Sequence, residues 1–285
     1  MSQIVPSTSP GGRSASLVPF LFGVAQRPEL PGPTLIRLLG DLGLTPAAAR
    51  ALLLRMRQEG KLASIRHGRG AAYRLAGEYG RRFDRIRAGG RPPAPQWPGA
   101  FHAVLYQVPE SRRAFRDALR RVAVQFGYGL LQPGVLIALD DRTGHLPLAD
   151  APPDALLLVT RLPLDEPDAA RAARVAWDLD TLAGTFATHA GALREALDAL
   201  PGPPSPGAET LRRYATLLRT PMVDTLSSPR LPAALFPPGW PLPKLWAEIQ
   251  AVQDVFGGPA SRYVAELLGT SAPPSTTTPP PTSRG

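Results

Sequence analysis

Residues 34–75 constrain what this chain can fold into more than any other part of it. Apolar residues recur at helical spacing in the first part of this stretch and stop just before Gly43, a residue that readily adopts the left-handed conformation that ends helices. Thr45 then has the side chain of an N-cap, and Pro46 suits the first position of a second helix that stops at Gly60. The sequence therefore predicts two helices joined by a tight turn.

Two short runs of β-prone residues, 62–65 and 71–75, follow the second helix. Between them lies a turn punctuated by glycines, which carries Arg66, His67 and Arg69. Two helices, a turn and a β-hairpin in this order are the pattern of a winged helix-turn-helix, whose second helix enters the major groove of DNA. We expect this domain to cover residues 14–91.

We expect the exposed face of the second helix and the hairpin to contact DNA. Arginine reaches phosphates and guanine edges, and small apolar side chains meet thymine methyl groups. The basic residues of the hairpin would position the protein without specifying sequence. The alternative is a solvated helix face, or an arginine held in a structural ion pair. The candidate DNA-binding residues are Thr45, Ala47, Arg50, Ala51, Leu54, Arg55, Arg57, Arg66, His67 and Arg69.

The excess of positive charge lies in the same part of the chain. The whole sequence has a formal net charge of +9. Residues 1–91 hold 15 basic and 5 acidic residues, which gives +10, and the remaining 17 basic and 18 acidic residues give −1. Double-stranded DNA, a polyanion, is therefore the expected partner of this segment.

Composition excludes several kinds of site. The chain has no cysteine, which excludes disulfides and cysteine-based metal sites. Its four histidines are far apart and have no metal-binding spacing, and neither a nucleotide-binding glycine motif nor a serine-hydrolase motif occurs. We therefore expect no enzyme activity, no metal and no cofactor.

No part of the sequence predicts a membrane segment. It holds no run of about 18 apolar residues, and its first residues lack the apolar core of a signal peptide. We expect a cytoplasmic protein. We also expect disorder over residues 1–13 and over residues 270–285, which are rich in proline, threonine and serine.

Proline-rich linkers at residues 87–98 and 201–207 divide the rest of the chain. The strand and helix patterns between them predict an α+β domain of ferredoxin-like type over residues 97–200, incomplete at its last strand. Residues 207–268 are expected to form a helical domain. The predicted strands are 101–108, 130–139 and 156–162, and the predicted helices are 110–126, 168–178, 179–200, 209–219 and 244–268.

The C-terminal helices also suggest where two copies of the chain meet. One short recognition helix reads too few base pairs for genomic specificity, so we expect a homodimer. Apolar faces within residues 209–268 have no local segment to cover them and are the expected two-fold contact. The alternative is that these faces close the core of a single chain. They are formed by Leu211, Leu217, Leu218, Leu245, Ile249, Val252, Phe256, Val264 and Leu267.

Several segments carry a resemblance to a known family. They are LGLTPAAARALLLRMRQEGKL, RHGRGAAYRL, PESRRAFRDALRRVAVQFGYGLLQPGVLIAL, AWDLDTL and LPAALFPPGWP. In this order they are similar to the recognition helix, the wing, the central domain and the two C-terminal signatures of the PaaX-like regulators, the repressors of phenylacetic acid catabolism. In that family the central domain resembles a Cas2-type ferredoxin fold.

The resemblance implies a dimeric transcriptional repressor that binds an inverted-repeat operator and is released by an acyl-CoA-type effector. The chain departs from the family at Pro221, which is expected to break a basic helix near the C-terminal signature. An adaptor that binds nucleic acid or a partner without an effector is the alternative. A metal-dependent nuclease is disfavoured, because Gln107 stands where a Cas2-type nuclease needs an aspartate to hold the metal ion.

Overall fold

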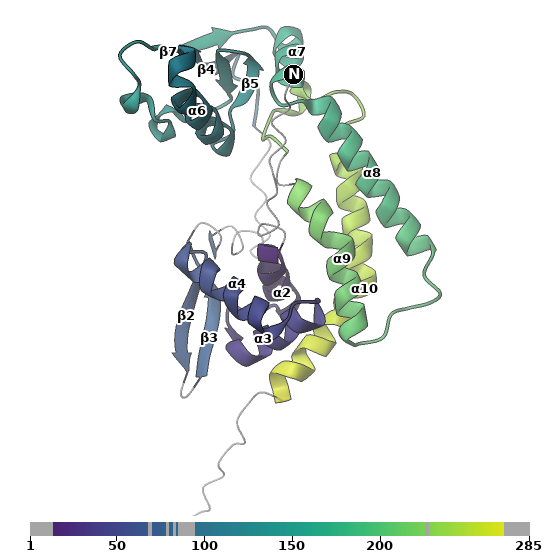
Figure 1. The fold of residues 1–285 in the computed structure, drawn as a ribbon. Helices are drawn as coiled ribbons and strands as arrows, with labels where there is room; N and C mark the ends of the chain where they lie inside the picture. The colour runs from purple at the N-terminus through teal and green to yellow at the C-terminus, as the bar shows by residue number, and fades with distance from the viewer. Residues whose placement is uncertain are drawn as a thin grey trace, which may run out of the picture. The chain divides into compact units, whose positions relative to one another are not determined.

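The computed structural model describes residues 14–67, 70–77, 80–81, 84, 95–225 and 228–270. These residues build a mixed α+β fold with two antiparallel sheets (Figure 1). The chain divides into two compact units. The N-terminal unit combines Met1–Arg91 with Ala199–Thr220 and Gln250–Gly285, and the central unit combines Pro92–Asp198 with Pro221–Ile249.

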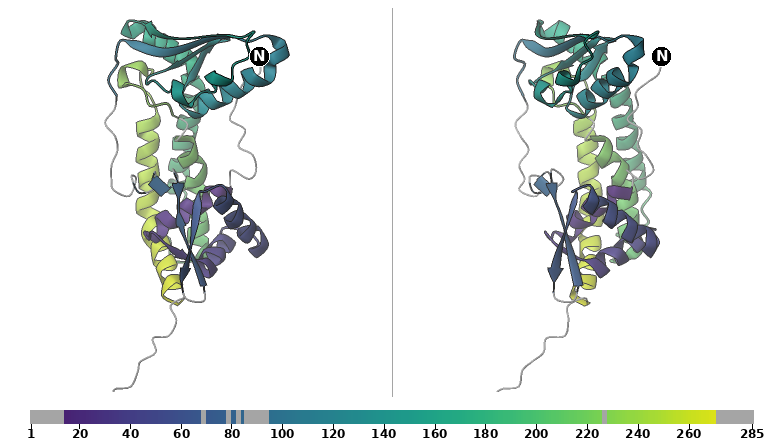
Figure 2. Two further views of the ribbon diagram at one scale, coloured as in Figure 1. Left: turned by 90° about the vertical axis from the view of Figure 1, so that its left-hand side faces the viewer. Right: turned by 60° about the vertical axis from the view of Figure 1, so that its left-hand side comes forward.

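The N-terminal unit begins with three helices and a three-stranded sheet of order β1-β3-β2 (Figure 2). The two predicted helices and the hairpin are confirmed in the predicted order, and β2 pairs with β3 in antiparallel fashion. Helix α2 and strand β1 are not predicted, because α2 is apolar nearly all round and shows no helical alternation. The bounds are α2 (Leu17–Ala25), β1 (Leu30–Pro31), α3 (Gly32–Asp41), α4 (Pro46–Gln58), β2 (Leu62–His67) and β3 (Gly70–Leu75).

The turn between α3 and α4 forms as predicted. Gly43 has a φ of 94°, in the left-handed region, and the Leu44 N–H donates to the Leu39 carbonyl at 3.0 Å. The Thr45 hydroxyl accepts a hydrogen bond from the Ala48 N–H at 3.2 Å and so caps α4. The buried faces of the three helices hold Leu21, Phe22, Leu35, Leu38, Leu39, Ala49, Leu53 and Met56.

The central unit contains a four-stranded antiparallel sheet of order β5-β6-β4-β7, the strand order of a ferredoxin-like fold. The prediction of one strand over residues 130–139 is wrong. Gly134, with a φ of 93°, turns the chain there and divides the segment into two strands. The elements are β4 (Ala100–Gln107), η1 (Glu110–Arg112), α6 (Arg113–Gln125), β5 (Gly129–Gln132), β6 (Val135–Ala138), η2 (Thr143–His145), η3 (Leu148–Asp150), β7 (Leu156–Pro163), α7 (Glu166–Ala176) and α8 (Leu179–Asp198).

The expectation of a sheet that is incomplete at its last strand is therefore wrong as well, because all four strands are present. The described segment between β6 and β7 holds the short turns η2 and η3 where a ferredoxin-like fold has its second helix. Alternate residues of β4 point to opposite faces of the sheet. Val104 packs with Leu119 of α6, whereas Ala103 packs with Ala173 of α7. The two helices thus cover opposite faces.

Two long helices, α9 (Ala208–Thr225) and α10 (Leu242–Thr270), follow α8. The expectation that Pro221 breaks its helix is wrong, because α9 continues beyond Pro221 and ends at Thr225. Pro221 is itself buried, and burial of its apolar ring offsets the backbone hydrogen bond that a proline removes. Both helices contribute residues to both units, so residues 207–268 are divided between the units.

The apolar faces of α9 and α10 are covered within one chain, which is the alternative considered from the sequence. Of the nine apolar residues that were expected to form a two-fold contact, Leu217 alone is partly exposed. The ground for placing a two-fold contact on these faces is therefore removed. The buried members of the set are Leu211, Leu218, Leu245, Ile249, Val252, Phe256, Val264 and Leu267.

Candidate nucleic-acid interface

Helix α4 presents one continuous exposed face to solvent. Ala47, Ala51 and Leu54 recur at helical spacing along the centre of this face. Leu54 is 53% exposed, so a large apolar side chain stands in water on a basic helix. Such a side chain is suited to contact with a thymine methyl group. The opposite face is held in the core by Ala49, Leu52, Leu53 and Met56.

Arginines flank the exposed face of α4. Arg50 and Arg57 lie two turns apart on one flank, both exposed, and no ion pair to another described residue is recorded for either. Arg55 lies on the other flank, with its Nε 3.9 Å from Glu59 Oε1. Lys61 Nζ donates to Glu59 Oε2 at 2.7 Å, and this hydrogen bond lowers the pKa of Glu59. The negative charge of Glu59, at the end of α4, is therefore balanced by Arg55 and Lys61.

The hairpin contributes Arg66, whose position follows from the strand register. Arg66 in β2 lies opposite Ala71 in β3, and the next pair on the same face is Ser64 with Tyr73. Arg66 is exposed and shares this face of the hairpin with Tyr73. Two predicted contacts are not placed. His67 ends β2 but its side chain is outside the described residues, and Arg69 lies outside them altogether.

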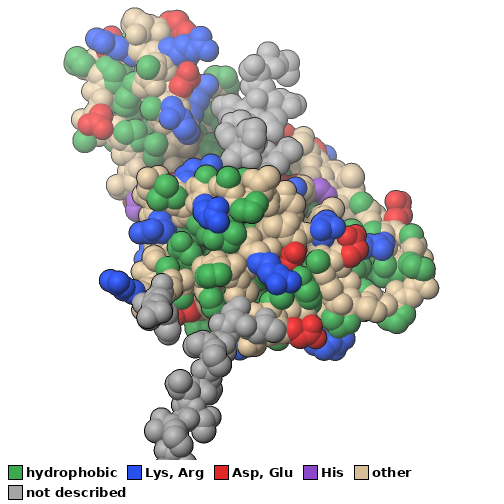
Figure 3. Space-filling model, turned by 60° about the horizontal axis from the view of Figure 1, so that its bottom comes forward, with side chains coloured by type: hydrophobic (Ala, Val, Ile, Leu, Met, Phe, Trp, Pro, Cys, Tyr) green, Lys and Arg blue, Asp and Glu red, His purple; other side chains and the backbone are tan. Residues whose placement is uncertain are grey.

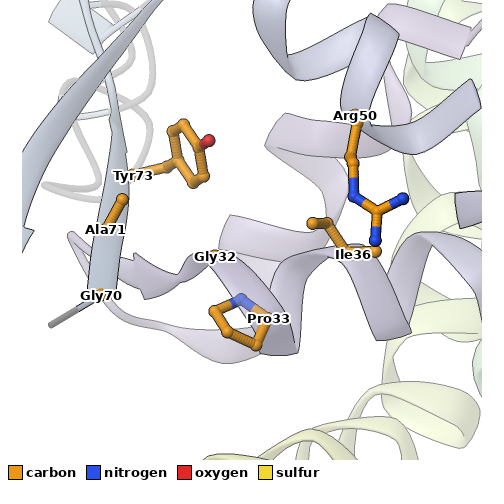
Figure 4. A pocket seen from close by; sticks show the side chains of 7 residues that line it. All are labelled: Gly32, Pro33, Ile36, Arg50, Gly70, Ala71 and Tyr73. Atoms are coloured by element: carbon orange, nitrogen blue, oxygen red, sulfur yellow. The ribbon is translucent and has the colours of Figure 1, made fainter. Parts of the chain in front are cut away.

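A groove with a volume of about 420 Å³ lies between the hairpin and helices α3 and α4 (Figure 4). Tyr73 from β3 and Arg50 from α4 reach into it from opposite sides, and Gly32 and Pro33 lie between them. Gly32 lets α3 approach β3 closely. A Cβ on Gly32 would lie 2.9 Å from the carbonyl oxygen of Ala71 and 3.2 Å from the Tyr73 ring. The groove therefore brings a phenol and a guanidinium, both hydrogen-bond donors, to one concave surface.

Two residues of this surface were not singled out from the sequence. Gln58 is exposed at the end of α4, one turn beyond Leu54, and a glutamine there can pair with adenine. Helical periodicity through Ala51 and Leu54 was sufficient to find it. Tyr73 belongs to the segment that resembles the wing of the family, but its place beside the groove depends on strand pairing and on the close approach at Gly32.

The basic side chains of this surface are separated from one another and are not gathered in one patch (Figure 3). They come from α3, α4 and both strands of the hairpin. Their fields add at a distance even where the individual charges are separated, so the surface attracts a polyanion as a whole. The exposed arginines of these elements are Arg37, Arg50, Arg55, Arg57, Arg66 and Arg74.

Residues of α9 and α10 hold the helices on which this surface is built. Arg212 Nε donates to the Asp41 carbonyl at 2.9 Å, and the Tyr263 hydroxyl donates to Asp41 Oδ2 at 2.9 Å. Burial and this hydrogen bond raise the pKa of Tyr263. The Ser261 hydroxyl donates to the Val24 carbonyl at 2.9 Å and joins α10 to α2. The candidate interface thus depends on residues at least 171 positions further along the chain.

Asp140 and Asp141, which follow β6 in the central unit, make hydrogen bonds within their own loop. Gln107 ends β4, as the sequence places it, with its side chain exposed. Asp141 accepts hydrogen bonds from the N–H and hydroxyl of Thr143, and Asp140 accepts one from Arg142 at 2.9 Å. In the described part of the chain no three His, Asp or Glu residues lie where they could hold one metal ion. No described helix is both long enough and apolar enough to cross a bilayer.

Comparison with known proteins bears on both units. Residues 13–79 match the family described as PaaX-like protein, and residues 94–147 match the PaaX protein central Cas2-like domain. A solved structure, the uncharacterized protein Rv0674 from Mycobacterium tuberculosis, is similar with a TM-score of 0.54 and 23% sequence identity. The similarity covers 90% of this chain and 97% of that one, and it concerns the fold. None of the curated proteins matches this chain.

Proposed function

Because the chain belongs to the PaaX-like family, whose members are generally transcriptional regulators, we propose that it regulates transcription by binding duplex DNA at specific sequences. The observation that carries the proposal is the exposed face of α4, flanked by Arg50 and Arg57 and bordered by the groove and the hairpin. The family is regulatory, so the chain is assigned no catalytic step.

Helix α4 enters the major groove in this proposal. Arg50 and Arg57 donate to guanine edges, and Gln58 pairs with adenine. Leu54, between them, contacts a thymine methyl group. The Thr45 hydroxyl accepts the capping hydrogen bond of α4, and its O–H hydrogen can still donate to DNA. Sequence is therefore read by a short stretch of one helix.

The hairpin and the groove hold the DNA backbone. Arg66 projects from the hairpin face that carries Tyr73, and the groove beside Tyr73 accommodates a sugar–phosphate unit. The Tyr73 hydroxyl and the nearby Arg66 guanidinium would donate to phosphate oxygens on this side of the duplex. Such contacts fix the register of α4 on the duplex without carrying sequence information.

A single α4 reads few base pairs, so we propose that a homodimer binds two half-sites arranged as an inverted repeat. We further propose that an acyl-CoA-type effector releases the dimer from DNA, as the resemblance implies. An effector that favours the form with low DNA affinity weakens DNA binding by its differential affinity, typically about 1–3 kcal/mol.

The two C-terminal segments that resemble family signatures meet in the core of the central unit. Leu179, from the first segment, and Leu231 and Leu235, from the second, are buried in one cluster. Trp177 and Trp240 pack against the same cluster. These residues therefore have a structural role in joining the two segments, whatever the effector is.

The proposal is tested by selecting duplexes from a random pool with the full chain and measuring affinity by fluorescence anisotropy. The selected duplex is compared with a scrambled duplex of equal composition over a range of salt. If a dimer neutralises about six phosphates, log K falls with log salt with a slope near −5. Acyl-CoA thioesters with aliphatic and aromatic acyl groups are then added, with free coenzyme A as the control.

Each outcome has a defined meaning. Equal affinity for the selected and scrambled duplexes, or binding that ignores salt, contradicts sequence-specific recognition by this surface. Binding that survives deletion of residues 1–91 assigns the DNA contact to another part of the chain. Specific binding that no thioester weakens supports an adaptor without this class of effector.

A further inference from the structure

The last residue of α3 is one that its own helix does not favour. Asp41 ends α3, and the last turn of this helix holds no basic residue. A carboxylate at this position lies at the negative end of the helix dipole, where cations are preferred. Local helix preference therefore does not account for Asp41, whereas its contacts with distant segments do.

Two helices from the C-terminal part of the chain bind Asp41 at different atoms. The N–H groups of residues 42–44, in the turn that follows, donate to the carbonyls of residues 38–40. The next carbonyl, that of Asp41, accepts a hydrogen bond from Arg212 Nε of α9 at 2.9 Å. The Asp41 carboxylate accepts another from the Tyr263 hydroxyl of α10, also at 2.9 Å. The end of α3 is thus capped by residues of two other helices.

Both donors are themselves oriented by neighbouring residues. Arg212 Nη1 donates to Glu209 Oε2 at 2.6 Å, which aligns the guanidinium along α9. Burial and the hydrogen bond to Asp41 raise the pKa of Tyr263, and Arg37, one turn before Asp41 on α3, opposes this rise. Because its pKa is raised, the phenol stays protonated near neutral pH and remains a hydrogen-bond donor.

The position of Asp41 constrains the start of α4. Only residues 42–44 separate Asp41 from the N-cap Thr45, and the N–H group of each is hydrogen-bonded to a carbonyl of α3. A connection this short and fully bonded has little freedom, so a shift at the end of α3 is passed to the first turns of α4, which carry Arg50. A side chain that reads a base edge must be held within about 0.5 Å of its productive position.

We propose that Asp41 is a positioning residue for DNA recognition, through which α9 and α10 set the orientation of α4. The inference rests on the proposed function, because it requires that α4 reads DNA. Both helices also supply residues to the central unit, so Asp41 is the place where a change in these helices reaches the DNA-reading surface. Loss of either hydrogen bond lets the end of α3 shift and lowers discrimination between sequences more than affinity for DNA in general.

The chain offers a matched control for each donor. Ser261 lies on the same helix as Tyr263 and donates to the Val24 carbonyl at the same distance, 2.9 Å, but this bond joins α10 to α2. Arg213 is the exposed neighbour of Arg212 on α9, and its guanidinium lies over an aromatic ring of α10. A merely structural role of the two donors predicts that each variant behaves like its control.

The first test measures anisotropy of the full chain with the selected and the scrambled duplex. Tyr263→Phe and Arg212→Ala should each weaken binding to the selected duplex by about fivefold. Their binding to the scrambled duplex should change little, because non-specific binding depends on charge. Ser261→Ala and Arg213→Ala should leave the ratio of the two affinities unchanged. The melting temperatures of Tyr263→Phe and Ser261→Ala should fall by similar amounts, because each variant loses one hydrogen bond.

The second test asks whether Tyr263 acts through Asp41. Asp41→Ala should lose discrimination between the two duplexes, whereas Asp41→Asn keeps an acceptor and should retain it. The double variant Asp41→Ala/Tyr263→Phe should lose no more than Asp41→Ala alone, because the bond is already absent. A further loss in the double variant, or an equal loss of discrimination in Ser261→Ala and Tyr263→Phe, overturns the role of Asp41.

Hydrogen exchange of the free chain tests the same inference without DNA. The amides of residues 42–44 should exchange faster in Tyr263→Phe than in Ser261→Ala, because only the first variant frees the end of α3. Equal exchange rates in the two variants overturn the role of Asp41. A wild-type chain that prefers no selected duplex overturns the proposed function, and the exchange rates then still decide whether Asp41 fixes the turn before α4.

Discussion

Arg50 and Arg57 differ from the other basic residues because they flank a helix face with apolar residues at its centre. If they read base edges, Arg50→Ala or Arg57→Ala should each lose about 1–3 kcal/mol of binding to the selected duplex and much less to a scrambled one. Arg66→Ala and Tyr73→Phe should weaken both duplexes by similar factors, since phosphate contacts carry no sequence information. Anisotropy titrations at one salt concentration compare the four variants, with Arg171→Ala on the central unit as the control. Uniform losses in all four would show that α4 only holds the backbone.

The ionisation of the Tyr214 phenol reports on how deeply α9 is buried. It packs against Phe20 and Phe256, and burial raises its pKa to about 12. The folded chain then holds a proton that the unfolded chain loses above about pH 10, so stability falls as pH rises from about 10 through about 12. Urea unfolding at about pH 9 and about pH 11.5 measures how much of the free energy of unfolding each protein loses between the two. The Tyr214→Phe variant should lose about 2 kcal/mol less than the wild-type chain. An equal pH dependence in the two proteins would mean that Tyr214 ionises normally.

At the scale of elements, the contact between α3 and β3 sets the position of the hairpin. A Cβ on Gly32 would lie 2.9 Å from the backbone oxygen of Ala71, so Gly32→Ala must move the helix or the strand. We expect a loss of about 1–3 kcal/mol in the free energy of unfolding, together with weaker binding to every duplex. Gly40→Ala in the same helix meets nothing within 4 Å and should stabilise the chain by about 0.5–1 kcal/mol. Thermal unfolding and DNA-binding anisotropy compare the Gly32→Ala and Gly40→Ala variants. Identical stability and affinity in the two variants would disprove close packing at Gly32.

At the scale of the whole molecule, the N-terminal unit is assembled from three separate parts of the chain. A fragment of residues 14–91 lacks Arg212, Ser261 and Tyr263, and each lost hydrogen bond removes about 1 kcal/mol. We expect this fragment to melt about 10 °C or more below the full chain in circular dichroism. A chain that lacks only residues 271–285 should melt like the full chain. A fragment as stable as the whole would show that α9 and α10 add nothing to the unit.

The sequence by itself determined the parts of the fold that depend on local interactions. Gly43, Thr45 and Pro46 specify the turn and the start of α4 because their effects act within one helical turn. Periodicity likewise identified α4, the hairpin and the strands β4 and β7. The family was also recognisable from segments within residues 13–79 and 94–147, which the family models match. The candidate contacts of α4 were predicted from one helix face.

Only the tertiary structure decided what depends on partners far apart in sequence. The leucines of α9 and α10 have the same pattern whether they cover a core or a dimer contact, and only packing showed that they are buried in one chain. Pro221 remains helical because its surroundings bury it. Tyr73 reaches the groove because Gly32 lets α3 approach β3. Leu105, Leu156 and Leu158 are exposed because α7 covers only part of the sheet. In each case the same local pattern is compatible with two environments, and the free energy of long-range packing selects between them.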